Sequence, residues 1–458
     1  MIAEKATELD DLRPRVEAGE WLTLDDGRRL YESPDIFTLG ELANAVRERL
    51  HGRNAYYNIN RHINYTNYCV LRCKFCSFYR PYQRDRAAGG MQSRRAGSPR
   101  DLAALDGAAP PPQAPPLQGR GASGTVVLDE GSTNDGGYEL SIDEIVARAK
   151  EAYSHGATEV HIVGGLHPKL TFDYYTGMCA AIREFCPHLH IKAFTAIEII
   201  HFTRIAKPRL TIAEVLTKLR EAGLGSMPGG GAEIFDDRVH DEAFKNKVGE
   251  AEWFEVHRTA HELGIFTNAT MLYGHVERPV ERIKHLVKLR AHQAESLRSR
   301  PAHFNCVIPL SFIPEGSALS HLPGPGGLDD LRTLAISRLM CPNIPHIKAF
   351  WIMQTPKIAQ ISLNWGVDDI DGTVVYYDIT KREGGGATHQ ELSVDKLQRL
   401  IVEARCKPVE RDTLYRRVNR DERSWRIEGE SFSVPYEAGP NEGERGRQDA
   451  EVKLSLSR

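Results

Sequence analysis

The most informative segment of this chain is Asn67-Tyr-Cys-Val-Leu-Arg-Cys-Lys-Phe-Cys-Ser-Phe-Tyr-Arg80. It contains Cys69, Cys73 and Cys76 in the spacing C-x3-C-x2-C and so supplies three thiolates. A tetrahedral zinc site would need a fourth Cys or His at a matching spacing, and the sequence has no second C-x2-C. Three thiolates suit a 4Fe-4S cluster that leaves one iron open for a small molecule. Three free buried thiols, or zinc held with a distant His, are the alternatives.

This cysteine spacing, with Phe75 directly before the last Cys, resembles the signature of radical S-adenosylmethionine (SAM) enzymes. The resemblance implies that the open iron of a 4Fe-4S cluster holds the amino and carboxylate groups of SAM. It also implies that an electron from the cluster cleaves SAM to methionine and a 5′-deoxyadenosyl radical. Phe75 and Phe78 are expected to lie beside the SAM molecule.

After the cysteine segment, the chain repeats one order: a helix, a glycine that ends it, and a short β-rich run. Ser141-Ile-Asp-Glu144 predicts a capping box for a helix that runs to His155, Gly156 ends this helix, and residues 158–163 are a predicted strand. The order recurs at Thr211-Ile-Ala-Glu214 with Gly223, at Gly264 and at Gly366.

Eight strands are predicted, over residues 60–66, 158–163, 190–195, 225–228, 265–272, 304–311, 347–353 and 369–375. Their alternation with helices predicts an α/β fold, a parallel (β/α)8 TIM-type barrel. A doubly wound sheet is the first rival, but no G-x-G-x-x-G follows an early strand. A partial barrel of six units is the second, and the last two predicted units argue against it.

The composition predicts four regions: a helical N-terminal extension over 1–57, the barrel over 58–436, a disordered insertion over 84–137 and a disordered tail over 437–458. Residues 35–46 of the extension have a helical apolar period. The insertion is rich in Arg, Ala, Gly and Pro and has too little apolar surface to offset its chain entropy. A lid over the site is the alternative interpretation of this insertion.

Charge and composition exclude several classes of protein. The 458 residues carry a net charge of −3, which predicts no nucleic-acid surface. No apolar run approaches a membrane span, and the acidic N-terminus lacks the apolar region of a secretion signal. An oxygen-sensitive cluster and unpaired cysteines suit a reducing, cytoplasmic location. Five further cysteines are interpreted as core residues: Cys179, Cys186, Cys306, Cys341 and Cys406.

Two carboxylates follow predicted strands, where the catalytic groups of a barrel gather. Glu233 comes after Pro228-Gly-Gly-Gly-Ala and is expected to bind the ribose of SAM, because a carboxylate accepts hydrogen bonds from two hydroxyl groups. Glu198 is expected to lie nearer the substrate. For both residues, a structural carboxylate that is fully hydrogen-bonded within the protein is the alternative.

Longer motifs resemble the aminofutalosine (aminodeoxyfutalosine) synthase family of the futalosine route to menaquinone. The similar segments are Asn60-Arg-His-Ile-Asn-Tyr-Thr-Asn67, the cysteine segment, Val163-Gly-Gly-Leu-His-Pro168, Lys192-Ala-Phe-Thr-Ala-Ile-Glu198, Gly229-Gly-Gly-Ala-Glu-Ile-Phe235, Asn268-Ala-Thr-Met-Leu-Tyr-Gly-His275, Lys348-Ala-Phe-Trp-Ile-Met353 and Asp371-Gly-Thr-Val-Val375. The similarity runs from about residue 35 to about residue 430, and the insertion is the one large departure.

The resemblance implies that the deoxyadenosyl radical adds to the enol-ether carbon of 3-[(1-carboxyvinyl)oxy]benzoate. The expected products are 6-amino-6-deoxyfutalosine, methionine and bicarbonate, with flavodoxin or ferredoxin as electron donor. It implies SAM contacts by Gly164, Gly165 and Tyr273, beside those named above. Candidate substrate or catalytic residues are His167, Glu198, His275, Arg80 and Lys192, with Arg61 as a further basic candidate for the substrate carboxylates.

Two other functions stay open at this point. One is a radical SAM enzyme that abstracts hydrogen, similar to dehypoxanthine futalosine cyclase or the FO synthase subunits. The other is an iron–sulfur or zinc binding module without catalysis. His167 and His275 are either proton carriers or polar residues at the rim of the barrel.

Overall fold

The computed structural model describes residues 9–82, 136–374, 377, 379 and 391–436. The predicted insertion over 84–137, except for its last two residues, and the predicted tail over 437–458 lie outside the described residues.

From residue 9 on, four helical segments precede the first strand: the 3-10 helix η1 (Asp10–Leu12), α1 (Arg13–Glu17), α2 (Leu24–Glu32) and α3 (Ile36–His51). The central strands are β1 (Asn54–Asn58), β2 (Asn60–Ile63), β3 (Glu159–Ile162), β4 (His190–Ala193), β5 (Thr267–Tyr273), β6 (Phe304–Ser311), β7 (His346–Ile347) and β8 (Asp369–Gly372). The C-terminal strands are β9 (Lys407–Glu410), β10 (Val418–Arg420), β11 (Ser424–Ile427) and β12 (Val434–Pro435).

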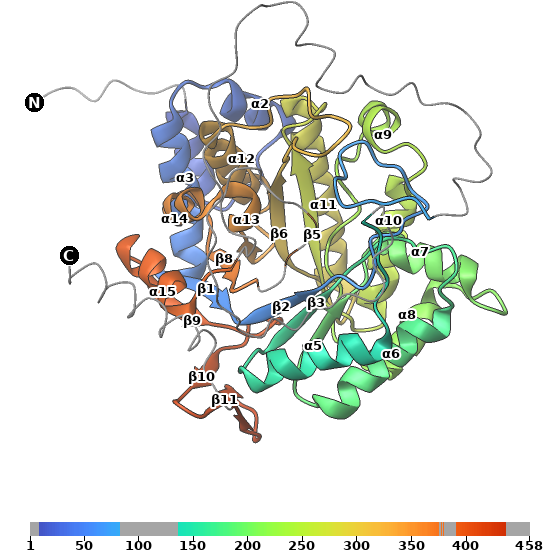
Figure 1. The fold of residues 1–458 in the computed structure, drawn as a ribbon. Helices are drawn as coiled ribbons and strands as arrows, with labels where there is room; N and C mark the ends of the chain where they lie inside the picture. The colour runs from blue at the N-terminus through green and yellow to red at the C-terminus, as the bar shows by residue number, and fades with distance from the viewer. Residues whose placement is uncertain (1–8, 83–135, 375–376, 378, 380–390, 437–458) are drawn as a thin grey trace, which may run out of the picture.

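Helices lie outside the strands, as Figure 1 shows. They are α5 (Ile142–Ser154), α6 (Phe172–Phe185), α7 (Ala196–Ile205), α8 (Ile212–Glu221), α9 (Asp237–Ala243), α10 (Glu250–Glu262), α11 (Pro279–Ser299), α12 (Gly327–Met340), α13 (Trp351–Gln354), α14 (Pro356–Ser362) and α15 (Val394–Glu403). Among the described helices, none has the length and apolarity that crossing a membrane requires.

Parallel pairing joins the strands into three short sheets, in the orders β2-β3-β4, β5-β6-β7 and β8-β1-β9. Single parallel bridges continue from one sheet to the next, between Lys192 and Ser226, Met227 and Thr267, and Lys348 and Asp369. The succession of pairings thus returns to β1, which leads directly into β2. This arrangement confirms the predicted α/β barrel class.

Apart from shifts of a few residues at other strand ends, the strands differ from the predictions at three places. Residues 304–311 form β6 as predicted, but residues 225–228 make only the single bridges at Ser226 and Met227. The predicted strand over 347–353 is wrong beyond Ile347, because the Phe350 carbonyl accepts the amides of Met353 and Gln354 and so starts the short helix α13. Strand β1 begins at Asn54, within the predicted N-terminal extension.

Local capping explains where the outer helices begin and end. Ser141 and Glu144 form the predicted reciprocal capping box of α5, and Thr211 forms the same motif at α8. Gly156 follows α5 with a φ of 78°, the left-handed conformation that glycine adopts without steric cost.

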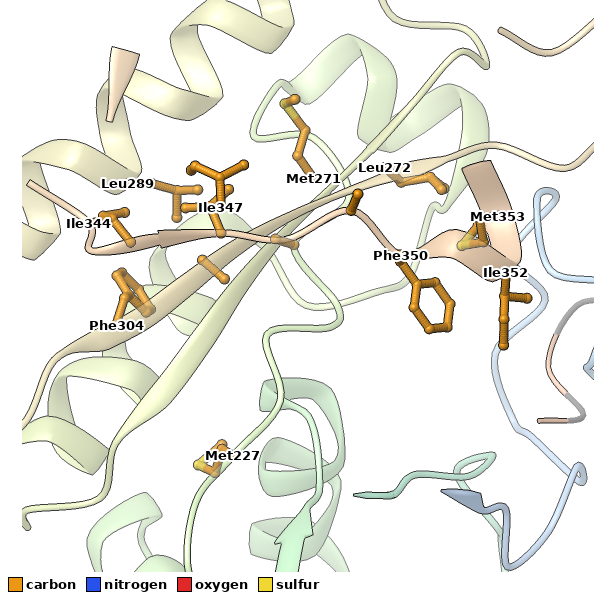
Figure 2. Packing of buried hydrophobic residues seen from close by; sticks show 14 of the residues in the cluster. Met227, Met271, Leu272, Leu289, Phe304, Ile344, Ile347, Phe350, Ile352 and Met353 are labelled. Atoms are coloured by element: carbon orange, nitrogen blue, oxygen red, sulfur yellow. The ribbon is translucent and has the colours of Figure 1, made fainter. Parts of the chain in front are cut away.

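The core lies between the strands and the surrounding helices. All seven residues of β5 are buried, as expected for a parallel strand that is covered on both faces. Figure 2 shows part of this packing, with Phe304 of β6 and Ile347 of β7 among the buried side chains. The loops that follow the strands are therefore carried on a rigid frame, and these loops hold the site.

Candidate active site

One cavity of about 310 Å³ opens at the ends of the barrel strands. Ten of the residues that the sequence singled out line it: Cys69, Cys73, Phe75, Cys76, Phe78, Gly164, Gly165, Lys192, Glu198 and Glu233. They come from the loops after β2 and β3, from β4, from the first turn of α7 and from the segment after Met227. The barrel thus brings residues that are far apart in sequence to one place.

The three cysteines are free and half-buried in the loop after β2. The Lys74 amide donates to the Ala243 carbonyl at 2.9 Å, and the Cys69 amide donates to the Arg80 carbonyl at 3.1 Å. These bonds fix the loop from both sides, so the thiols are positioned before any metal binds.

The ligand set at the cavity matches the one that the sequence predicts. Cys69, Cys73 and Cys76 line one cavity together with the residues that are expected at SAM. Three thiolates leave one iron of a 4Fe-4S cluster open for a small molecule, so these side chains fit that cluster.

The glycine turn after β3 packs directly on the cysteine loop. A Cβ atom added to Gly165 would lie 2.2 Å from the Tyr68 carbonyl oxygen, so no larger residue fits there. The Gly165 amide donates to Thr66 at 2.8 Å, and the Val70 amide donates to Leu166 at 3.0 Å. Gly165 is therefore required by the close approach of the cysteine loop, whereas the predicted approach of this turn to SAM stays a prediction.

Glu198 has no unused acceptor position toward a ligand. One carboxylate oxygen accepts the Thr195 amide and hydroxyl at 2.7 and 2.8 Å, which caps α7. The other accepts the Tyr65 hydroxyl at 2.7 Å and the Gly164 amide at 3.2 Å. Burial raises the pKa of this carboxyl group. These contacts favour the structural alternative, in which Glu198 holds the glycine turn in place.

Glu233 points into the cavity and pairs with Lys247, which sequence reasoning missed. Burial lowers the pKa of Lys247, but the Glu233 carboxylate and Cys73 outweigh burial and leave it above its ordinary value. The Lys247 ammonium lies 5.0 Å from the centre of the Phe75 ring. A buried cation therefore stands between the cysteine loop and the proposed ribose ligand. No motif or residue spacing in the sequence around Lys247 indicated that this residue would line the cavity.

Tyr273 and His275 do not line the cavity. The Tyr273 hydroxyl donates to Asp330 at 2.6 Å, so its side chain faces α12 outside the barrel. His275 contacts the Leu272 carbonyl at 3.1 Å and lies 3.4 Å from Glu277. These partners draw both side chains away from the place that the predicted roles require.

His167, Arg80 and Arg61 also lie outside the cavity lining. His167 accepts the amides of Lys169 and Leu170 at 3.1 Å, and burial lowers its pKa to about 4. Arg80 donates to the carbonyls of Ser77 and Tyr79, and Arg61 pairs with Glu151 at 3.0 Å. All three side chains are thus engaged within the protein.

The deep end of the cavity is polar. Lys192 pairs with Glu159 at 2.5 Å, and Lys348, just after β7, pairs with Asp371 at 3.0 Å. His62 and His161 line the same end. Of these cavity residues, sequence reasoning found only Lys192. Lys348 opens one of the segments quoted above, and its place at a strand end is the signal that could have found it.

Comparison with known proteins identifies the family. Residues 63–289 match the radical SAM superfamily, and residues 302–423 match the CofH/MqnC C-terminal region. The aminodeoxyfutalosine synthase of Thermus thermophilus is 41% identical over 88% of this chain and 94% of its own length. The chain belongs to the CofH/MqnC family of radical SAM enzymes. Membership implies a 4Fe-4S cluster and SAM, and Cys69, Cys73 and Cys76 are placed to hold the cluster.

Other CofH/MqnC relatives carry two different names. The aminodeoxyfutalosine synthase of Streptomyces coelicolor is 35% identical over 88% of this chain and 92% of its own length. The 5-amino-6-(D-ribitylamino)uracil–L-tyrosine 4-hydroxyphenyl transferase of Archaeoglobus fulgidus is 34% identical over 86% of this chain and 96% of its own.

Solved structures confirm the fold of this radical SAM enzyme. Methylornithine synthase (PylB) superposes with a TM-score of 0.60 at 17% identity, covering 87% of this chain and 97% of its own. The FeFe-hydrogenase maturase HydG from Carboxydothermus hydrogenoformans gives 0.60 at 14% identity, covering 89% and 80%.

Proposed function

We propose that this enzyme is an aminodeoxyfutalosine synthase of menaquinone biosynthesis. It would join the deoxyadenosyl group of SAM to 3-[(1-carboxyvinyl)oxy]benzoate and release 6-amino-6-deoxyfutalosine, methionine and bicarbonate. The observation that carries the proposal is the 41% identity to the Thermus thermophilus synthase along nearly the whole of that protein. The cavity adds chemical support, because it contains basic side chains for an anionic substrate.

The residues at the mouth of the cavity suit SAM and the cluster. Cys69, Cys73 and Cys76 would hold the cluster, which supplies the electron for SAM cleavage when it is bound. Glu233 has the acceptor oxygens for a ribose diol. The Gly164–Gly165 turn lines the cavity beside the cysteine loop, where its backbone would lie against the methionine part. A flavodoxin or ferredoxin would deliver the electron.

The deeper cavity suits an aromatic dicarboxylate. Lys192 and Lys348 are buried cations, and an ammonium group has three donors, so each can bind a carboxylate beside its protein partner. Between the two ends the wall is apolar, with Ile308, Leu310 and Met353 among its residues. Such a wall packs on an aromatic ring and excludes water from the radical.

A hydrogen-abstracting enzyme is the second candidate. The 34% identity to the Archaeoglobus fulgidus transferase and the match to the CofH/MqnC C-terminal region favour it. In that case, or for a dehypoxanthine futalosine cyclase, the deoxyadenosyl group would leave as free 5′-deoxyadenosine.

The fate of the adenosyl group separates the two candidates. We expect that SAM labelled in its adenosyl part, incubated anaerobically with reductant, enzyme and the enol-ether benzoate, transfers the label to the coupled nucleoside. A carbon radical held about 3–3.5 Å from an electron-poor alkene gains roughly 7–11 kcal/mol from positioning alone, so addition should dominate. Mass spectrometry of the nucleoside products measures the outcome.

The control for this experiment is Cys73→Ala, which should lose both the cluster absorbance and SAM cleavage. If nearly all label appeared as free 5′-deoxyadenosine beside a product without the adenosyl group, the synthase assignment would be wrong. A Cys73→Ala protein that kept a full cluster and turnover would instead overturn the ligand assignment.

A further inference from the structure

Three cavity residues form a row across neighbouring strands at the deep end of the barrel. His62 on β2 is paired in register with His161 on β3, and His161 is paired with Lys192 on β4. All three side chains line the cavity. The cysteine loop follows β2, whereas these residues lie within the strands, so the row lies deeper in the barrel than the cysteine loop does.

His62 has hydrogen-bonding groups that the protein leaves unused. Its side chain is buried, yet neither ring nitrogen has a hydrogen-bond partner among the described residues. Its ring stacks on that of His161 with centroids 4.5 Å apart and an interplanar angle of 24°. A buried polar group without a partner is costly, and a ligand group can supply that partner.

The electrostatic surroundings keep this histidine neutral. Burial lowers the pKa of His62 to about 4, and burial also holds the pKa of His161 well below its ordinary value. Near pH 7 each imidazole therefore offers one N–H donor and one acceptor nitrogen. The adjacent Lys192 ammonium, which pairs with Glu159, adds donors that this one carboxylate does not use up. Together these side chains suit a carboxylate group of a ligand better than a cationic or an apolar group of a ligand.

We propose that His62, His161 and Lys192 bind the ring carboxylate of an aromatic dicarboxylic substrate, with the alkene held toward the cysteines. This assignment rests on the proposed function. It states which of the substrate's two carboxylates lies at the deep end of the cavity. The enol-ether carboxylate is attached to the reacting alkene, so it must lie near SAM. The ring carboxylate is then the group left for the far end. The row acts as a positioning site, because it touches the substrate away from the reacting carbon.

The test compares two unreactive analogues on the cluster-loaded enzyme. The saturated ether 3-(1-carboxyethoxy)benzoate carries both carboxylates, and 2-phenoxypropanoate lacks the ring carboxylate. By anaerobic titration calorimetry, we expect the native enzyme to prefer the dicarboxylate by about tenfold or more, the scale of a hydrogen bond to a charged group. His62→Phe keeps an aromatic ring against His161 but removes both nitrogens. This variant should lose most of the preference while its affinity for 2-phenoxypropanoate stays within about twofold.

Two further variants keep the test decisive. His161→Leu removes both nitrogens of the second imidazole and should also reduce the preference, so the test still works if the His62→Phe protein folds poorly. His188→Phe is the matched control, since exposed His188 stacks on Phe432 away from the cavity, and it should bind as the native enzyme does. An unchanged preference in the folded His62→Phe or His161→Leu variant overturns the assignment, as does a native enzyme that binds both analogues equally. A native enzyme that binds neither analogue would refute the proposed substrate class, and the assignment with it.

Discussion

Glu233 carries its carboxylate at a φ of 47°, a backbone conformation that residues with a Cβ seldom adopt. Its carbonyl accepts the Leu272 amide at 3.0 Å, and Lys247 pairs with its side chain. The backbone is thus held in an unfavourable region, which is typical of residues that serve a site. The geometry directs this carboxylate toward the space where SAM is expected.

Glu233→Gln should weaken SAM binding by roughly 1.5–3 kcal/mol, because the amide loses one of the two acceptor oxygens that pair with a ribose diol. Equilibrium binding of SAM to the cluster-loaded variant measures this change. The double variant Glu233→Gln/Lys247→Met is the control, since it removes the unpaired buried cation that the single change leaves. If the double variant bound SAM as tightly as the native enzyme, the ribose role would be refuted.

His285 on α11 makes stability depend on pH. Its Nδ1 accepts the Phe235 amide at 3.2 Å, and its Nε2 donates to the Thr270 carbonyl at 3.0 Å, so the ring must be neutral. Burial lowers its pKa to about 3. Between about pH 6.5 and pH 3 the unfolded chain binds a proton that the native protein does not, so stability falls as the pH falls.

The expected slope from His285 is at most about 1.4 kcal/mol per pH unit within that window. His285→Gln keeps a donor and an acceptor but does not titrate. It should therefore flatten the fall in the free energy of unfolding between pH 6.5 and pH 5, measured by denaturant titration. An identical pH slope in native and variant proteins would show that this ring does not titrate on unfolding.

Among the elements, α7 is the helix most directly joined to the site, because its capping residue Glu198 also binds the Gly164 amide. Glu198→Gln can accept only one of the two backbone amides, at Thr195 and Gly164, that the two carboxylate oxygens accept now. We expect a loss of about 1–3 kcal/mol in stability together with weaker SAM binding. Thermal unfolding and SAM titration measure the two effects.

The matched control for α7 is Glu214→Gln on α8, which makes the same substitution in an equivalent capping box on the exposed surface. It should lower stability less and leave SAM binding unchanged, since α8 supplies no residue of the cavity lining. Weaker SAM binding in Glu214→Gln, or normal binding in Glu198→Gln, would refute the link between the cap of α7 and the glycine turn.

Strand β5 shows why sequence placed some site residues correctly and others wrongly. Side chains alternate between the two faces of a strand, and Thr270 and Leu272 line the cavity while Tyr273 faces α12. The strand itself was predictable from its apolar run, but a strand buried on both faces has no polar alternation that tells inward from outward positions. His62 and His161 were missed for the same reason. Glycine turns and cysteines were found because their chemistry does not depend on whether a strand position points inward or outward.

At the scale of the whole molecule, the described residues at the two ends of the predicted insertion lie against the same loop. Asn67 donates to the Gly136 carbonyl at 2.9 Å, and Tyr82 packs edge-on against Tyr68 with ring centroids 5.3 Å apart. Deleting residues 86–134 should therefore leave the cluster and turnover nearly intact, because the cost of closing a loop changes slowly with its length. Cluster absorbance and product formation measure the result. A large loss of turnover with an intact cluster would instead support a lid.

Strand β1 pairs with β9, a strand that the ribosome makes much later. Asn54 to Tyr57 pair with Lys407 to Glu410, so the partner strand is made about 350 residues later. At about 5–20 residues per second, one edge of β1 waits roughly 20–70 s for that partner. During this interval an unpaired strand edge, and the cysteine loop that follows β2, are exposed to other chains. Slow synthesis at low temperature and a supply of iron and sulfide during translation should thus raise the yield of intact enzyme more than refolding of the finished chain.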